Sequence, residues 1–330
     1  MKSFALVNPT TLDGALEALR AAMDRRGRSK AALLAGGQDL LTELKEHLSE
    51  PEVVVNLKGV PGLDAILVEG DLLRMGALAT LSAIEGHPAI LERAPALAQA
   101  AASVASPQIR SVGTLGGNLC QRPRCWYYRL EEAKCIKKGG AECFSYSGRN
   151  KYNAIFGGGP SYIVHPSDLA TALVALDASV VVLTQKGLQT TPIERFYTLP
   201  SEGSILKETI LKPDEILVEV QVPLDALARA SAWSKFKERA SYDWALASVC
   251  ASVEKDAGKV NRARIALGGV APIPWRVPAA EALLVGKALD EATIAAACEE
   301  ALRGAEPLSE NGYKIPLAKG LLTRVLRGLA

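Results

Sequence analysis

The fold of the amino-terminal part is decided by one run, Ala31-Ala32-Leu33-Leu34-Ala35-Gly36-Gly37-Gln38-Asp39-Leu40. Its apolar residues favour a buried strand, the two glycines end that strand, and a helix is expected to begin near Asp39. An amphipathic helix pattern precedes the run at residues 12–25, and a β-rich segment follows it at residues 53–57. Because strands and helices alternate, we predict a small α/β subdomain over residues 1–57.

A second glycine turn, Ser111-Val112-Gly113-Thr114-Leu115-Gly116-Gly117-Asn118, follows a predicted helix at residues 81–105. Glycines leave backbone N–H groups unobstructed and a helix amino terminus adds partial positive charge, so both turns suit a diphosphate. Each could also be a tight turn that needs a positive φ angle. Neither matches the Rossmann or P-loop glycine pattern. Two separate turns could hold one dinucleotide from two sides.

The rest of the chain predicts two further units. Paired strands at 65–80, a helix at 169–177 and strands at 179–184 and 216–222 indicate a second α/β subdomain over residues 58–228. A polar, cysteine-rich insertion of about residues 120–160 interrupts it, and loops of that length are usually functional or disordered. Residues 229–330 predict an α+β domain, with strands near 232–239 and 262–269 and helices near 245–253, 278–286, 290–303 and 316–329.

Composition excludes several classes of protein. Hydrophobic residues make up 48% of the chain and charged residues 22%, which is ordinary for a globular protein. A net charge of +2 gives no sign of nucleic-acid binding. Because no long apolar run and no signal-peptide pattern occurs, we expect no membrane span and a cytoplasmic location, unless a partner carries an export signal. Small molecules and protein partners are the expected ligands.

The cysteines are crowded in one polar segment. Four of the six have the spacing C-x4-C-x9-C-x7-C, at Cys120, Cys125, Cys135 and Cys143. This is neither the spacing of a zinc ribbon nor that of a bacterial ferredoxin, but the surrounding basic residues would stabilise a negatively charged iron–sulfur cluster. Structural zinc and buried thiols are the alternatives. Cys250 and Cys298 lie on apolar helix patterns and are predicted to be core residues.

Further motifs follow the two glycine turns in order along the chain. They are His165-Pro166-Ser167-Asp168, Pro213-Asp214-Glu215-Ile216-Leu217, Phe236-Lys237-x-Arg239-x-Ser241-x-Asp243 and Leu267-Gly268-Gly269-Val270-Ala271. With Ala35-Gly36-Gly37-x-x-Leu40 and residues 113–118 as pyrophosphate loops, the set resembles the FAD-binding subunits of the molybdopterin dehydrogenases. Each motif alone is weak, but their common order over nearly the whole chain is specific.

The resemblance implies a flavin-binding fold of the vanillyl-alcohol-oxidase type, in which two α/β subdomains clasp FAD and a carboxy-terminal α+β domain covers it. By position, Asp168 would contact the adenosine end or a nearby loop, although Ser167-Asp168 also resembles a helix cap. Ile216 and Leu217 would lie near the flavin or adenine. Lys237 would lie near the isoalloxazine, where a cation stabilises the reduced anion, unless it is an exposed strand lysine. The diphosphate would be held by Ala35, Gly36, Gly37, Gln38, Asp39, Leu40, Gly113, Thr114, Gly116, Gly117 and Asn118.

The cysteine segment resembles the branch of the family that has a 4Fe–4S insertion beside FAD. In that branch the ligands would be Cys125, Cys135, Cys143 and a residue just before the His-Pro-Ser-Asp motif, where this sequence has Ser161. A serine oxygen is a poorer ligand for cluster iron than a thiolate. We therefore expect Cys120 to supply the fourth thiolate. Ligation by Ser161 and an incomplete or lost cluster are the alternatives.

The resemblance also implies a function without a catalytic residue in this chain. A large molybdenum-cofactor subunit would convert the organic substrate, a small 2Fe–2S subunit would relay electrons, and the FAD of this chain would pass them to an external acceptor. A self-contained flavin oxidase and an iron–sulfur or zinc sensor module are the alternatives. Turnover by the isolated chain would identify the oxidase, and metal without flavin would identify the sensor.

Overall fold

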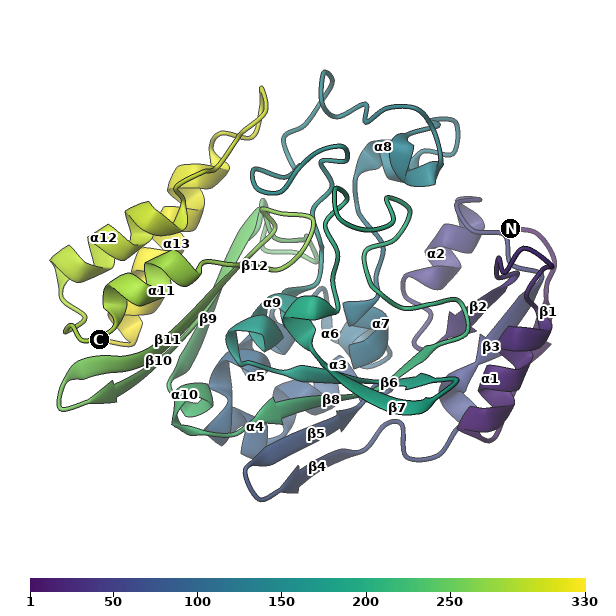
Figure 1. Ribbon diagram of the computed structural model, residues 1–330, viewed down its shortest axis with the longest axis horizontal. Helices are drawn as coiled ribbons and strands as arrows, with labels where there is room; N and C mark the ends of the chain where they lie inside the picture. The colour runs from purple at the N-terminus through teal and green to yellow at the C-terminus, as the bar shows by residue number, and fades with distance from the viewer.

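Three β-sheets organise residues 1–330 of the computed structural model (Figure 1). The first is parallel, with the order β1-β3-β2, and consists of β1 (Ala5–Val7), β2 (Ala31–Leu34) and β3 (Val53–Asn56). Helix α1 (Leu12–Ala21) buries Leu16 and Leu19 against this sheet, and α2 (Leu40–Lys45) follows β2. The amino-terminal α/β unit is thus as predicted, with α1 shorter than the sequence pattern.

The second sheet is antiparallel, with the order β4-β5-β8-β6-β7. Its strands are β4 (Ile66–Glu69), β5 (Leu72–Gly76), β6 (Ser179–Thr184), β7 (Gly187–Pro192) and β8 (Ile216–Pro223). Neighbouring residues of β8 face different cores, because Ile216 packs with α1 and β3 whereas Leu217 packs with the central helices. The sheet therefore joins the first subdomain to the rest of the chain.

The segment predicted as one helix at 81–105 consists of three helices. They are α3 (Leu81–Gly86), α4 (Pro88–Arg93) and α5 (Pro95–Ala102), and a proline is the first residue of the second and third. Proline has no backbone N–H and suits the first turn of a helix, so it ends one helix and begins the next. Helices α6 (Pro107–Arg110), α7 (Leu115–Leu119) and α9 (Asp168–Ala175) complete this region, and α10 (Ala226–Arg229) precedes the last domain.

The third sheet, β12-β11-β10-β9, is antiparallel and has helices on both faces (Figure 1). It contains β9 (Ser231–Phe236), β10 (Ala247–Asp256), β11 (Lys259–Gly268) and β12 (Trp275–Arg276). Helices α11 (Pro278–Leu284), α12 (Glu291–Ala301) and α13 (Lys314–Gly328) form a common core with this sheet, while α5 and α9 of the preceding region also contact it.

The prediction of a helix at 245–253 is wrong, because this segment forms strand β10. Its first seven residues are all buried, since β10 is covered on both faces, and a strand of that kind shows no alternation of polar and apolar residues. Cys250 is therefore a core residue of a strand, whereas Cys298 is a core residue of α12, as predicted.

The insertion at residues 120–160 consists mainly of loops, with the short helix α8 (Trp126–Arg129) near its start (Figure 1). Its distal end is attached to the carboxy-terminal domain by Lys314, which is fully buried. The Nζ of Lys314 donates to the carbonyls of Tyr152 at 2.8 Å, Asn153 at 3.0 Å and Gly269 at 2.7 Å, and burial lowers the pKa of Lys314 to about 7.

None of the helices is long and apolar enough to cross a membrane.

Candidate functional site

The two glycine turns line one cleft of about 540 Å³. They touch each other where Gly36 meets the backbone before Gly113, because a Cβ on Gly36 would lie 2.3 Å from the carbonyl oxygen of Val112. Any side chain at Gly36 would therefore push the two turns apart. Residues 35–40 and Gly113, Thr114, Gly117 and Asn118 all line the cleft, together with Asp168 and Lys235 of the neighbouring elements.

The first turn offers consecutive backbone donors to this cleft. The N–H groups of Gly36, Gly37, Gln38 and Asp39 donate to no other group of the protein. Gly37 has a φ angle of 73°, in the left-handed region that favours glycine. A series of unused N–H groups at a glycine turn is the arrangement that binds a phosphate oxygen. This turn therefore fits a dinucleotide diphosphate.

The second turn uses its backbone donors within the protein, with the exception of the Thr114 N–H. Leu115 N–H donates to Ala79 O at 2.8 Å, Gly116 N–H to Ala77 O at 2.7 Å, Gly117 N–H to Thr114 Oγ1 at 3.2 Å and Asn118 N–H to Thr114 O at 2.8 Å. A Cβ on Gly116 would lie 2.9 Å from the Cβ of Ala77, so this glycine permits close packing. Gly113, Thr114, Gly117 and Asn118 of this turn line the cleft.

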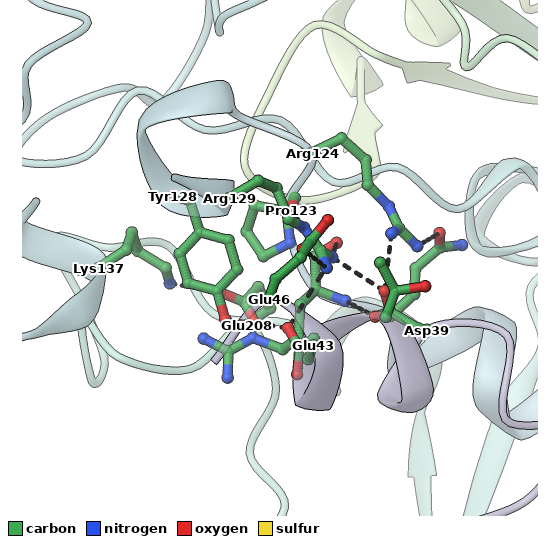
Figure 2. Close-up of polar contacts among 12 residues, drawn as sticks. Asp39, Glu43, Glu46, Pro123, Arg124, Tyr128, Arg129, Lys137 and Glu208 are labelled. Carbon is green, nitrogen blue, oxygen red and sulfur yellow. Dashed lines mark hydrogen bonds and ion pairs between the residues drawn. The ribbon is translucent and has the colours of Figure 1, made fainter. Parts of the chain in front are cut away.

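Asp39 joins the first turn to the cysteine-rich insertion (Figure 2). Its carboxylate lies 2.7 Å from Arg124 Nη1 and 2.9 Å from Arg129 Nη2, and it accepts from the N–H of Arg122 at 2.7 Å. The carboxylate is thereby neutralised by two guanidinium groups. Without them, a negative charge would stand beside donors that suit an anion, where it would repel a phosphate.

More acidic groups hold the same part of the insertion (Figure 2). Glu43 of α2 accepts from the Tyr128 hydroxyl at 3.1 Å, and burial raises the pKa of the Glu43 carboxyl. Glu208 lies 2.8 Å from Arg122 Nε and 2.5 Å from Lys137 Nζ. The basic residues of the insertion therefore bind carboxylates of α2 and of the loop after β7.

Asp168 and Lys235 form a buried ion pair on the cleft wall. Asp168 is the first residue of α9, and Ser167 is its cap, accepting from Ala170 N–H at 3.0 Å. The Nζ of Lys235 lies 2.6 Å from Asp168 Oδ2. Burial raises the pKa of the Asp168 carboxyl, while the charge of Lys235 opposes this shift. Lys235 stands two residues before Lys237 in a predicted strand, and residues two apart in a strand lie on the same face. The sequence could therefore have indicated Lys235 as well as Lys237.

Three other residues expected at the cofactor do not line this cleft. Lys237 Nζ donates to the carbonyl of Ser241 at 2.6 Å, and Lys237 lines a neighbouring groove, whereas Lys235 lines both that groove and the cleft. Ile216 and Leu217 are buried in the two cores on either side of β8 and do not line the cleft. The structure therefore brings Lys235, rather than Lys237, to the glycine turns.

The four cysteines of the insertion are not gathered into one group. Cys120 lines the dinucleotide cleft, and burial raises the pKa of its thiol to about 12. Burial raises the pKa of the Cys125 thiol, and Cys125 lies with Cys143 beside Tyr162 rather than in the cleft. No group of three or more His, Cys, Asp or Glu side chains is arranged to hold a metal ion. The expectation that Cys120 joins the other thiols does not match these contacts.

Ser161 lies beside this pair of cysteines. The N–H of Tyr162, the next residue, donates to Cys143 Sγ at 3.5 Å. The side-chain amide Nδ2 of Asn153 donates both to Tyr162 O at 2.9 Å and to Cys125 Sγ at 3.8 Å. Ser161 is 1% exposed, and its hydroxyl has no hydrogen-bond partner. Cys135 is also buried. The residues thus fit a four-iron cluster only in part.

A second cavity of about 270 Å³ adjoins the cleft. Arg124, Pro166, Asp168, Asp243 and Trp244 line both spaces, and Cys125 and His165 line the second one only. His165 is fully buried, and burial lowers its pKa to about 3, so its ring is neutral at pH 7. The cysteine segment and the glycine turns are therefore neighbours across a shared wall.

Comparison with known proteins identifies the family. The family described as the FAD-binding domain in molybdopterin dehydrogenase matches residues 2–225, and the carbon monoxide dehydrogenase flavoprotein C-terminal domain matches residues 231–329. The chain belongs to the FAD-binding subunits of the molybdopterin dehydrogenases. The resemblance read from the glycine turns and the later motifs is thereby confirmed, while the branch with a 4Fe–4S insertion is not.

Relatives from this family cover nearly the whole chain. The aldehyde oxidoreductase FAD-binding subunit PaoB of Escherichia coli (strain K12) is 35% identical over 300 residues, which are 90% of this chain and 90% of that protein. The carbon monoxide dehydrogenase medium chain of Hydrogenophaga pseudoflava is 28% identical over 303 residues, 90% of this chain and 88% of that one.

Solved structures of the family agree with the observed fold. A chain of carbon monoxide dehydrogenase from Hydrogenophaga pseudoflava superposes with a TM-score of 0.76 at 28% identity, covering 99% of this chain and 96% of that chain. A chain of quinoline 2-oxidoreductase from Pseudomonas putida 86 gives a TM-score of 0.77 at 26% identity, covering 100% and 98%. The mixed α/β fold with a carboxy-terminal domain, as predicted, is that of an FAD-binding molybdopterin dehydrogenase subunit.

Proposed function

We propose that this family member passes electrons from the iron–sulfur centres of partner subunits, through bound FAD, to an external acceptor. The observation that carries the proposal is the cleft between the two glycine turns, where four consecutive N–H groups have no partner in the protein. FAD supplies the ability to accept and release one or two electrons. The partners are a large molybdenum-cofactor subunit and a small 2Fe–2S subunit, which is supported by relatives named as a medium chain or an FAD-subunit.

Within this proposal the residues have separate tasks. The first turn, Ala35–Leu40, binds the diphosphate through its N–H groups, and Gly113, Thr114, Gly117 and Asn118 form the opposite wall. Gly116, also expected at the diphosphate, packs on Ala77 behind this wall. Asp168, held by Lys235, lies on the wall toward the second cavity. The roles of Ile216, Leu217 and Lys237 near the flavin or adenine stay predictions, as do the division at residues 57 and 228 and a cytoplasmic location.

We also propose a 4Fe–4S cluster in the insertion, with Cys125, Cys135 and Cys143 as ligands. The position of Cys125 and Cys143 on either side of Tyr162 supports it, and Ser161, whose buried hydroxyl has no partner, directly precedes Tyr162. These contacts favour Ser161 over Cys120 for the fourth position. We expect Cys143→Ala to lower iron content sharply, whereas Cys120→Ala keeps it, with the core variant Cys298→Ala as the control. Iron loss in Cys120→Ala alone would restore Cys120 as the ligand.

The function is tested by comparing the chain alone with the chain in its complex. The isolated chain should contain FAD and oxidise no organic donor, whereas in the complex an organic donor should bleach the flavin absorbance. Rapid turnover of a donor by the pure chain would favour a self-contained flavin oxidase. Metal without flavin in the purified chain would favour a sensor module.

A further inference from the structure

Arg124 occupies the junction of the two cavities. It lines both the cleft with the glycine turns and the adjoining cavity of about 270 Å³. It belongs to the cysteine-rich insertion, which is not part of either glycine turn. Its side chain is only 19% exposed, although it carries a charge. A buried guanidinium needs hydrogen-bond acceptors, so its contacts show which of its N–H groups are paired within the protein and which are not.

Three parts of the protein position this guanidinium. Nη1 lies 2.7 Å from Asp39 of the first turn, and Nη2 donates to Gln121 Oε1 at 3.0 Å, just after the second turn. The guanidinium carbon stands 4.8 Å from the ring centre of Trp244, from the carboxy-terminal domain. These contacts fix the group beside the cleft, and Figure 2 shows it directed toward Asp39.

The contacts do not use all of its donors. A guanidinium has five N–H groups, and the two polar contacts above occupy one on each terminal nitrogen. Nε is buried and has no hydrogen-bond partner in the protein. Unused guanidinium donors beside four unused backbone N–H groups form a set of donors with no acceptor. An anion with several oxygens would satisfy such a set.

We infer that Arg124 binds the diphosphate of the dinucleotide held by the first glycine turn. The inference rests on the proposed function, because it assumes FAD in this cleft. Asp39 explains why a cation is needed: its carboxylate directly follows the unused N–H groups of Gly37 and Gln38 and would repel a phosphate. Arg124 and Arg129 together neutralise that charge, and of these two only Arg124 lines the cleft. The insertion thereby completes the FAD site.

Arg129 supplies a matched control. It belongs to the same insertion and binds the same carboxylate oxygen at 2.9 Å, but it lines neither cavity. If Arg124 acted only by holding Asp39 and the insertion in place, Arg129→Met would have the same effect as Arg124→Met. If Arg124 contacts the ligand, only Arg124→Met should change the environment of the two phosphorus atoms.

The experiment measures FAD affinity and the phosphorus-31 NMR spectrum of bound FAD in the full chain. We expect Arg124→Met to raise the dissociation constant about tenfold to a hundredfold and to shift a diphosphate resonance. Arg124→Lys keeps the charge but loses the planar fork, so it should shift the same resonance with a smaller loss of affinity. Arg129→Met should lower stability and leave the resonances in place.

The outcomes separate this inference from the proposed function. Absence of FAD binding by the wild-type chain would refute the function itself. Normal FAD binding with unshifted resonances in both Arg124 variants would overturn the inference alone. A changed flavin absorbance with unchanged phosphorus resonances would overturn it as well, because Arg124 would then face the ring. Equal shifts in Arg129→Met would also overturn the inference, because Arg124 would then act only by holding Asp39 in place.

Discussion

The two glycine turns look alike in the sequence and differ in where their backbone N–H groups go. In the first turn, the N–H groups from Gly36 to Asp39 have no partner in the protein. In the second, the N–H groups from Leu115 to Asn118 bind Ala77, Ala79 and Thr114. The first turn is therefore free to bind an anion, whereas the second is fixed in place by its own hydrogen bonds. A glycine pair alone does not distinguish these two uses.

The largest effect is expected where the two turns touch. Gly36→Ala would place a Cβ 2.3 Å from the carbonyl oxygen of Val112, and a backbone atom cannot move aside as a side chain can. We expect a loss of about 3 kcal/mol in the free energy of unfolding, measured by urea denaturation. Gly320→Ala is the control, because nothing lies within 4 Å of its Cβ position on α13. An unchanged midpoint for Gly36→Ala would mean that the turns can separate without cost.

The second largest effect is expected at Gly37, where a substitution should abolish FAD binding without unfolding the protein. Gly37→Val forces a branched residue into a left-handed conformation, which costs about 1–2 kcal/mol. Its Cβ would also crowd Leu41 at 3.1 Å and Leu34 at 3.3 Å, so the turn that carries the unused N–H groups must shift. The fold should survive and FAD should be lost. Gly117→Val should weaken FAD less, because the Gly117 N–H already binds Thr114 and only Thr114 Oγ1 lies near its Cβ position, at 3.0 Å.

FAD affinity of the two purified valine variants, measured by flavin fluorescence, tests this order. A greater loss in Gly117→Val than in Gly37→Val would mean that the second turn, not the first, supplies the principal diphosphate contacts. Circular dichroism of both variants would verify that the fold is retained.

The smallest effect concerns the internal support of the second turn. Thr114 is the cap of α7, and its hydroxyl accepts from Gly117 N–H at 3.2 Å. Thr114→Ala should lower the free energy of unfolding by about 1 kcal/mol, whereas Thr114→Ser keeps the hydroxyl and most of the stability. Thermal unfolding of the two variants measures the difference. Equal melting temperatures would show that the hydroxyl gives this turn no support.

Local patterns in the sequence predicted much of the fold. The strand at 179–184 lies where it was expected, and the strand before the first turn ends one residue earlier. Such strands are short, apolar and bounded by turn residues, so neighbours along the chain define them. The helix expected at 245–253 failed because β10 is covered on both faces and lacks alternation. The segment expected as one helix at 81–105 is divided at Pro88 and Pro95, each of which is the first residue of a new helix.

The site was only partly predictable, because it depends on contacts between distant segments. The glycine turns were found through their residue type. Lys235 was missed because its partner, Asp168, is 67 residues away in the chain. In the sequence Arg124 is one of several basic residues around the cysteines, and nothing there places it against Asp39 and Trp244. The choice between Cys120 and Ser161 likewise depends on how a long loop without periodicity folds.

The central claim is that one FAD binds in the cleft of this chain with its diphosphate at the first glycine turn. Titration of the FAD-free wild-type chain and of Gly37→Val with FAD, followed by flavin fluorescence, tests it most directly. The account predicts one FAD per wild-type chain and no saturable binding by a folded Gly37→Val variant. Wild-type affinity in the folded variant, or no binding by the wild-type chain, would contradict it.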